Sequence, residues 1–258
     1  DQSVAVQVTE QDAAARVHQL LVVRTGSTLL ITDAQAGTTP LGMDALAASL
    51  VGTLQRLCGP SSGTCPTTPT VADADVPPAG EFPGSLAAGD LPRVTPGTGV
   101  WVGAEIKPMK LGGSGCEGVD LTAVTSATRA VQHAYLLTGD QGASANFGLD
   151  EIVYTFANEA DAKAFSDGVI ASVTDCPKQQ ATATVTPLGR LEAPASGQLF
   201  TVDQRKTIDK AARSRVMVAS QGVHAVYLAA NPTPEFDLKD EAWLAVLQRA
   251  IIRAKQLP

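Results

Sequence analysis

The chain has little positive charge and few aromatic side chains. It carries 19 lysines and arginines against 26 aspartates and glutamates, so its formal net charge is −7, and aromatic residues make up 4% of it. A nucleic-acid surface needs clustered Lys and Arg to displace counterions, and an anionic membrane surface attracts the same residues. We therefore expect no nucleic-acid partner and no attachment to an anionic membrane.

Long apolar runs are also missing. No stretch approaches the roughly 20 apolar residues of a membrane-spanning helix, and residues 1–15 lack the charged and apolar blocks of a signal peptide. We expect no direct membrane insertion of this segment. Asp1 is typical of the middle of a protein rather than its beginning, so we expect an anchor or a signal upstream.

Motifs of common catalytic and cofactor sites are absent. The sequence has no Cys-x-x-Cys pair, no Cys/His zinc spacing, no G-x-S-x-G elbow and no glycine pattern that binds nucleotides. We expect no metal, no cofactor and no enzymatic activity. Each of His18, His133 and His224 lies in a strand-like segment, where a histidine is usually hydrogen-bonded in place. A secreted hydrolase with His133 as its base is a minor alternative.

The four cysteines divide into a near pair and a far pair. We expect Cys58–Cys65 and Cys116–Cys176 disulfides, which loop-closure arithmetic values at ~2.5 and ~4 kcal/mol. Disulfides persist in oxidising compartments. The expected location is therefore extracytoplasmic, either secreted or anchored through a segment outside this sequence. Reduced, buried cysteines in a cytosolic protein are the alternative.

The sequence contains an internal repeat. Residues 18–56 return near the end as residues 214–249: Gly26 falls on Gly222, and Leu54-Gln55-Arg56 falls on Leu247-Gln248-Arg249. Each copy has two β-prone runs around a short turn, followed by a helix. A further strand-like segment precedes each hairpin. A hairpin with one apolar face cannot bury that face alone, so two such units most simply pack together or share a sheet.

The repeat and the composition predict three parts. Residues 1–58 form a first hairpin-helix unit, whose helix carries Leu46, Leu50, Leu54 and Leu57 on one face and ends at Cys58-Gly59-Pro60. Residues 59–99 are a linker rich in Pro and Gly. Residues 100–258 form a second, complete domain. The first copy lacks a counterpart of residues 100–197, which either lies upstream of Asp1 or never existed. We expect an α+β fold of antiparallel sheets with helices packed on one face, fastened by disulfides.

The second region continues with alternating strands and helices. Residues 129–137 alternate so that His133 and Tyr135 share a face, and residues 149–156 are a candidate antiparallel neighbour. Asn158 then predicts a helix N-terminus, with an apolar stripe that ends at Cys176. Strands are expected at residues 181–188, 199–204, 215–220 and 223–228, and a last helix at residues 238–255 with Trp243 in the core.

This order of elements resembles the PknH-like extracellular sensor domain of actinobacteria. The resemblance covers about Val100 to Leu257 and is carried by Cys116, by IVYTFANEADAKAF ending at Phe165, by Asp175-Cys176-Pro177, and by RVMVASQGVHAVYL with its closing helix. That family occurs as kinase ectodomains and as secreted lipoproteins. The resemblance implies a disulfide-fastened α+β domain with a ligand cleft. The Cys58/Cys65 pair and the missing kinase domain depart from the family pattern.

The leading hypothesis is a non-catalytic extracytoplasmic sensor or ligand-binding domain. The candidate cleft residues are Trp101, His133, Tyr135 and Tyr154, because aromatic and imidazole groups combine an apolar body with a polar edge. The glycine-rich stretches 112–118 and 139–148 predict turns that can rim a cleft. The alternative is a protein-interaction module of the cell envelope, recruited through exposed strand edges. The expected partner is therefore an unknown small molecule or an envelope protein.

Overall fold

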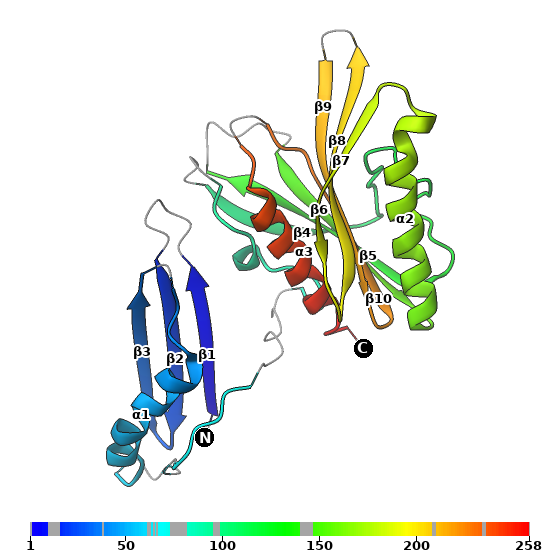
Figure 1. Cartoon of the computed structure of the whole chain (residues 1–258). Coiled ribbons are helices and arrows are strands. Elements are labelled where there is room, and N and C mark those ends of the chain that lie inside the picture. The colour runs from blue at the N-terminus through cyan, green and yellow to red at the C-terminus, as the bar shows by residue number, and fades with distance from the viewer. Residues whose placement is uncertain are drawn as a thin grey trace. The chain divides into compact units, whose positions relative to one another are not determined.

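The chain forms two compact units, Asp1–Ala74 and Asp75–Pro258 (Figure 1). The computed structural model describes residues 2–9, 16–37, 39–60, 63, 65, 67–72, 82–94, 99–139, 147–207, 210–233 and 236–257. The boundary between the units lies inside the predicted linker 59–99, of which residues 61, 62, 64, 66, 73–81 and 95–98 lie outside the described residues.

The first unit is a three-stranded antiparallel sheet with one helix. Its strands are β1 (Gln2–Thr9), β2 (Val17–Thr25) and β3 (Thr28–Ala36), hydrogen-bonded in that order. Helix α1 (Met43–Cys58) packs Leu46, Leu50 and Leu54 onto Leu21 of β2. The Cys58–Cys65 disulfide follows the helix.

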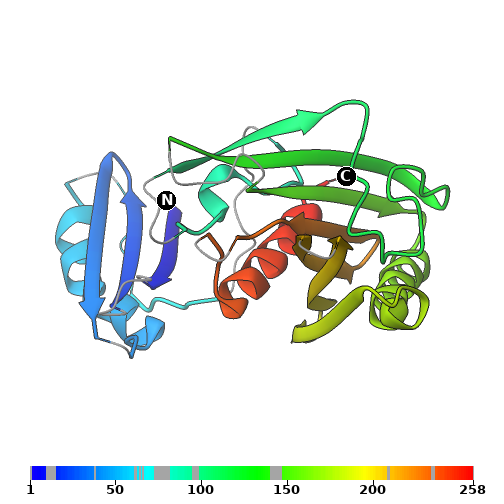
Figure 2. The same cartoon turned by 90° about the horizontal axis from the view of Figure 1, so that it is seen from above.

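The second unit is built on a seven-stranded antiparallel sheet in the order β4-β5-β6-β10-β9-β8-β7. Its strands are β4 (Val100–Ile106), β5 (Ala127–Thr138), β6 (Gly148–Phe156), β7 (Ala183–Leu191), β8 (Ser196–Thr207), β9 (Lys210–Gln221) and β10 (His224–Ala230). Figure 2 shows β4, β5 and β6 side by side. Its long helices are α2 (Glu159–Gln179) and α3 (Asp240–Ala254). The Asn158 side chain caps α2 by accepting the amide of Asp161, as predicted.

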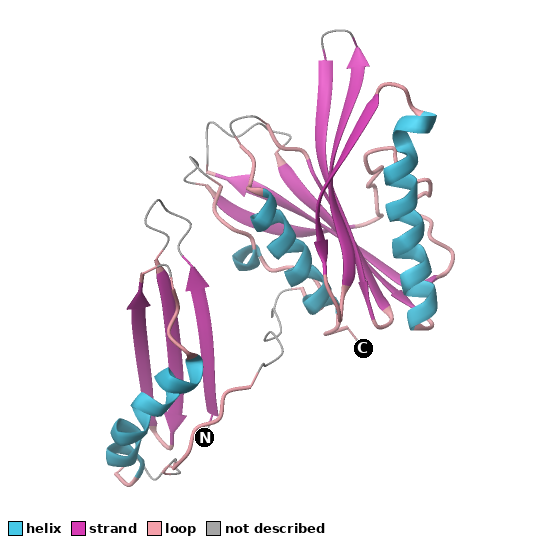
Figure 3. Ribbon diagram, viewed as in Figure 1, coloured by secondary structure: helices cyan, strands magenta, loops and turns pink. Residues whose placement is uncertain are grey.

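Helices α2 and α3 cover opposite faces of this sheet (Figure 3). On β9, Met217 and Ala219 pack with α3, whereas Val216 and Val218 pack with α2, and all four are fully buried. The α+β class, the antiparallel sheets and both disulfides are confirmed. The prediction that helices pack on one face is wrong for this unit. Every residue of β10 is buried, because successive side chains of a strand point to opposite faces and both faces are covered.

The two segments of the predicted repeat have the same order of elements, and each includes the strand expected before its hairpin. Strands β8, β9 and β10 with α3 have the connectivity of β1, β2 and β3 with α1. Gly26 and Gly222 occupy the two hairpin turns with φ of 54° and 57°, a conformation that favours glycine. A spacing of 196 residues separates these two glycines, and it also relates the contacts described next.

A polar side chain on the middle strand holds the start of the helix in both copies. In the first unit, buried Gln19 makes two hydrogen bonds with the main chain of Leu41, of 2.7 and 2.8 Å. In the second unit, Arg215 binds Asp237 at the equivalent place. The two copies therefore share this contact although different residues, Gln19 and Arg215, make it.

Part of the predicted linker belongs to the core of the second unit. Residues 82–94, with a single 3₁₀ turn at Ala88–Asp90, bury Leu86, Leu91 and Val94 against the α3 side of the sheet. Composition rich in Pro and Gly conceals this packing, because three apolar side chains in irregular structure have no period to detect. We call residues 82–94 the strap.

Candidate functional site

A glycine-rich loop is fastened between the sheet and the end of α2. Its Cys116 forms the disulfide with Cys176 in the last turns of that helix. The neighbouring carboxylate of Glu117 is buried and accepts hydrogen bonds from the Tyr227 hydroxyl at 2.6 Å and from the amide and hydroxyl of Ser114. The Tyr154 hydroxyl donates to the carbonyl of Leu121 at 2.6 Å. These bonds hold the following residues, 119–126, at a fixed distance from α2.

A groove of about 390 Å³ lies between residues 119–126 and the first half of α2. Its apolar lining includes Val124, Phe165 and Val169. Gly168 also lines it, and a Cβ atom built on this glycine meets no atom within 4 Å. The volume lies at the lower end of the range for pockets that take small molecules.

The charge of the groove is negative. Asp120 and Asp161 are its only ionisable side chains among the described residues that line it. Hydrogen bonds from the hydroxyl and amide of Thr122 lower the pKa of Asp120 and keep its carboxylate ionised. An apolar wall with an acidic rim suits an amphipathic ligand with an apolar body and a cationic or hydrogen-donating group.

The four predicted cleft residues lie elsewhere and do not form one site. Trp101, His133 and Tyr135 lie on the α3 face of β4 and β5, beside the strap, whereas Tyr154 lies on the α2 face of β6. All four are buried. The Trp101 indole donates to the carbonyl of Pro92 in the strap at 2.8 Å. Burial raises the pKa of Tyr154 far above the neutral range, so its hydroxyl serves as a structural donor. Of the predicted rims, residues 112–118 lie next to the groove, and residues 140–146 lie outside the described residues.

His133 is buried on β5 beside two aromatic rings. It is 4% exposed, and its ring lies 4.5 Å from that of Phe82 and 6.5 Å from that of Tyr135, measured between centroids. Among the residues that the structure describes, its Nδ1 atom has no hydrogen-bond partner. Burial lowers the pKa of His133, and the nearby Glu105 carboxylate opposes that effect. A neutral imidazole is the consequence.

Glu151 is a buried acid that the sequence analysis did not single out. It lies on β6 opposite His133, and it accepts the amide of Leu86 in the strap at 3.1 Å. The Tyr135 hydroxyl lies 2.8 Å from its carboxyl oxygen and 2.6 Å from the carbonyl of Leu86. One hydroxyl hydrogen cannot serve both contacts, and a carbonyl has none, so the second hydrogen belongs on Glu151. Burial raises the pKa of Glu151 to about 7, which agrees with that count.

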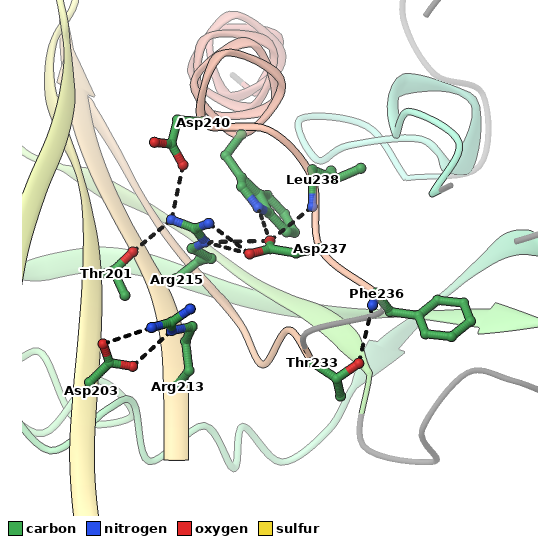
Figure 4. A network of polar contacts seen from close by, with 10 residues as sticks. Thr201, Asp203, Arg213, Arg215, Thr233, Phe236, Asp237, Leu238 and Asp240 are labelled. Carbon is green, nitrogen blue, oxygen red and sulfur yellow. Dashed lines mark hydrogen bonds and ion pairs between the residues drawn. The ribbon is translucent and has the colours of Figure 1, made fainter. Parts of the chain in front are cut away.

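A second polar network anchors α3 to the sheet (Figure 4). Arg215 is 9% exposed and donates to Asp237 at 2.7 Å and to the Thr201 hydroxyl at 2.6 Å. It also pairs with Asp240 in the first turn of α3 at 3.0 Å. Asp237 in turn accepts the Trp243 indole at 2.8 Å. The guanidinium of Arg215 is therefore bound by side chains of the same unit, which indicates a structural role.

The comparisons identify no relative. No family model, no curated protein and no solved structure matches the chain. Within the described ranges, no group of three or more His, Cys, Asp or Glu side chains is arranged to bind a metal ion. Nor does any helix in those ranges combine the length and apolar character that crossing a membrane requires. The two disulfides indicate an oxidising, extracytoplasmic setting.

Proposed function

We propose that the second unit is a non-catalytic ligand-binding domain that works outside the cytoplasm as a sensor, with the groove between residues 119–126 and α2 as its site. The observation that carries this proposal is the groove itself, with its apolar wall and its rim of Asp120 and Asp161. The resemblance of Val100 to Leu257 to PknH-like extracellular sensor domains supports the same assignment.

The rigidity of the groove walls also supports binding. One wall is a helix capped by Asn158 and bonded through Cys176, and the other is a loop fixed by Cys116 and by the Tyr154 hydroxyl. Preorganised walls lower the entropy that a ligand must overcome when it binds. The ligand class is a small amphipathic molecule whose cationic group meets the two carboxylates.

The test is a titration with two probes of equal apolar length and opposite charge, hexyltrimethylammonium and hexyl sulfate. We expect saturable amide chemical-shift changes in residues 119–126 and 159–169 with the cation, and much weaker ones with the anion. Gly168→Leu places a side chain in the groove and should abolish the changes, whereas Gly168→Ala, whose Cβ meets open space, should retain them. Equal shifts in both variants, or shifts located elsewhere, would count against this site.

A protein-interaction module of the cell envelope is the second candidate. It is favoured by the first unit, where β3 is the outer strand of the described sheet and two large apolar side chains on it, Leu29 and Ile31, are exposed. Exposed edges with apolar side chains are typical of surfaces that recruit another chain.

A further inference from the structure

The repeat allows the two faces of the first sheet to be compared with their counterparts. At the spacing of 196 residues, the residues Leu20, Val22, Leu29 and Ile31 correspond to Val216, Val218, Ala225 and Tyr227. Both sets lie on the face opposite the shared helix, which is α1 in one unit and α3 in the other. The two copies therefore carry apolar residues at equivalent positions on this face of the sheet.

In the second unit this surface is completely covered. All four of its residues are 0% exposed, and they belong to the cluster that α2 completes. The outer edge of β10 is covered too, because β10 pairs along its whole length with β6. The covering elements are consecutive in the chain, since α2 begins three residues after β6 ends.

In the first unit the described residues provide no such cover. Leu29 is 57% exposed and Ile31 is 61% exposed, although their counterparts are fully buried. An antiparallel sheet can leave one face in water when that face is polar, but this one carries the apolar side chains of Leu20, Val22, Leu29 and Ile31.

The two ends of this face carry opposite charges, and these are complementary to the charges at the two ends of a helix such as α2. Arg24 lies at the turn end, and Asp33 with its partner His18 lies toward the other end. Helix α2 starts at the corresponding turn, since the amide of Phe156 donates to Val223 there. Its first turn is acidic, with Glu159 and Asp161, and its last turn is basic, with Lys178.

We propose that the edge of β3 and the face formed by Leu20, Val22, Leu29 and Ile31 bind a strand followed by an amphipathic helix from outside residues 1–258, in the manner of β6 and α2. The acidic start of that helix lies over Arg24, and its basic end lies toward Asp33. This inference names the partner of the interaction-module candidate, and it does not depend on the groove of the second unit. Strand addition supplies main-chain hydrogen bonds, and the helix supplies apolar cover.

The test uses the full chain and a synthetic peptide of residues 148–180 with Cys176→Ser as the probe. Methyl spectra should show saturable shifts at Leu29 and Ile31 as the peptide is added. Ile31→Lys should weaken binding at least tenfold. Leu136→Lys is the matched control, because Leu136 is 53% exposed on β5 of the second unit, and it should leave the affinity unchanged.

A charge reversal makes the orientation testable. Arg24→Glu should weaken binding severalfold, and a peptide with Glu159→Lys and Asp161→Lys should restore it. No saturable shift up to millimolar peptide would overturn the proposal, as would binding that Ile31→Lys leaves intact. If sedimentation shows that the chain alone is a dimer dissociated by Ile31→Lys, a second copy covers the face and the proposal is wrong. Loss of probe binding in the groove has no bearing on these outcomes.

Discussion

The buried acid Glu151 predicts how stability responds to pH, and Glu151→Gln is the perturbation that isolates it. The amide of glutamine can donate to the Tyr135 hydroxyl and accept from the Leu86 amide, so the variant keeps the network in the arrangement of the protonated acid. It differs from the wild type only when Glu151 ionises. The variant therefore separates the effect of charge from the effect of packing.

The magnitude follows from the two pKa values of this side chain. Burial raises the pKa of Glu151 from the ordinary value of 4.5 to about 7. Between these values the folded chain holds a proton that the unfolded chain has released, so stability falls as pH rises, by about 1.4 kcal/mol per pH unit. The contribution is fully present below pH 4.5 and is lost above pH 7. The total loss over this window is about 3 kcal/mol.

Urea unfolding followed by tryptophan fluorescence is a suitable assay, because both tryptophans, Trp101 and Trp243, belong to the second unit. The difference in free energy of unfolding between Glu151→Gln and wild type should be small at pH 4.5. It should grow to about 3 kcal/mol in favour of the variant at pH 8. Glu192→Gln, at an exposed position after β7, controls for the loss of one negative charge. A difference that stays constant across this pH range would refute the reasoning.

Four further variants test the packing of the second unit, with the free energy of unfolding as the measurement in each case. Gly168→Ala should stabilise it by about 1 kcal/mol, because alanine favours the helix and its Cβ meets open space. A loss of stability would contradict the open space at this position of α2. Gly84→Ala should destabilise it by about 2 kcal/mol, because Gly84 has φ of 82° and its Cβ would overlap Leu257; an unchanged stability would show that the strap is loose there. Arg215→Ala should cost about 3 kcal/mol by leaving Asp237 without its buried partner, and a cost below about 1 kcal/mol would rule out that role. Replacing Cys116 and Cys176 by alanine should cost up to about 4 kcal/mol, the loop-closure value for a separation of 60 residues, and an undiminished stability would argue against the bond.

Local signals in the sequence account for most of the elements. Alternation located β5 and β6, an N-capping Asn158 located α2, and the repeated glycine located both hairpin turns, since each signal depends on neighbouring residues. The placement of helices on both faces was missed. The apolar run of β10 contains the evidence, because a strand with both faces buried reads as continuous rather than alternating.

The candidate site was harder to predict because it is made by long-range contacts. Asp120 and Asp161 line the same groove because the Cys116–Cys176 disulfide and the Tyr154 hydroxyl hold the loop next to the helix. Trp101, His133 and Tyr135 have the chemistry of cleft residues, but they pack beneath the strap. Glu151 did leave a signal in the sequence. It is an acid on the buried face of an apolar strand, where a charge is expected only with partners.

The repeat also separates scaffold from site. Both copies contain three strands and a helix, with Gln19 or Arg215 holding the start of that helix. The groove uses none of these elements, because its walls are residues 119–126 and α2, which have no counterpart among the described residues of the first unit. Helix α2, which covers this apolar face of the second unit, is thus also one wall of the groove. A partner that completes the first unit with a strand and a helix of this kind would therefore bring one wall of a second groove with it.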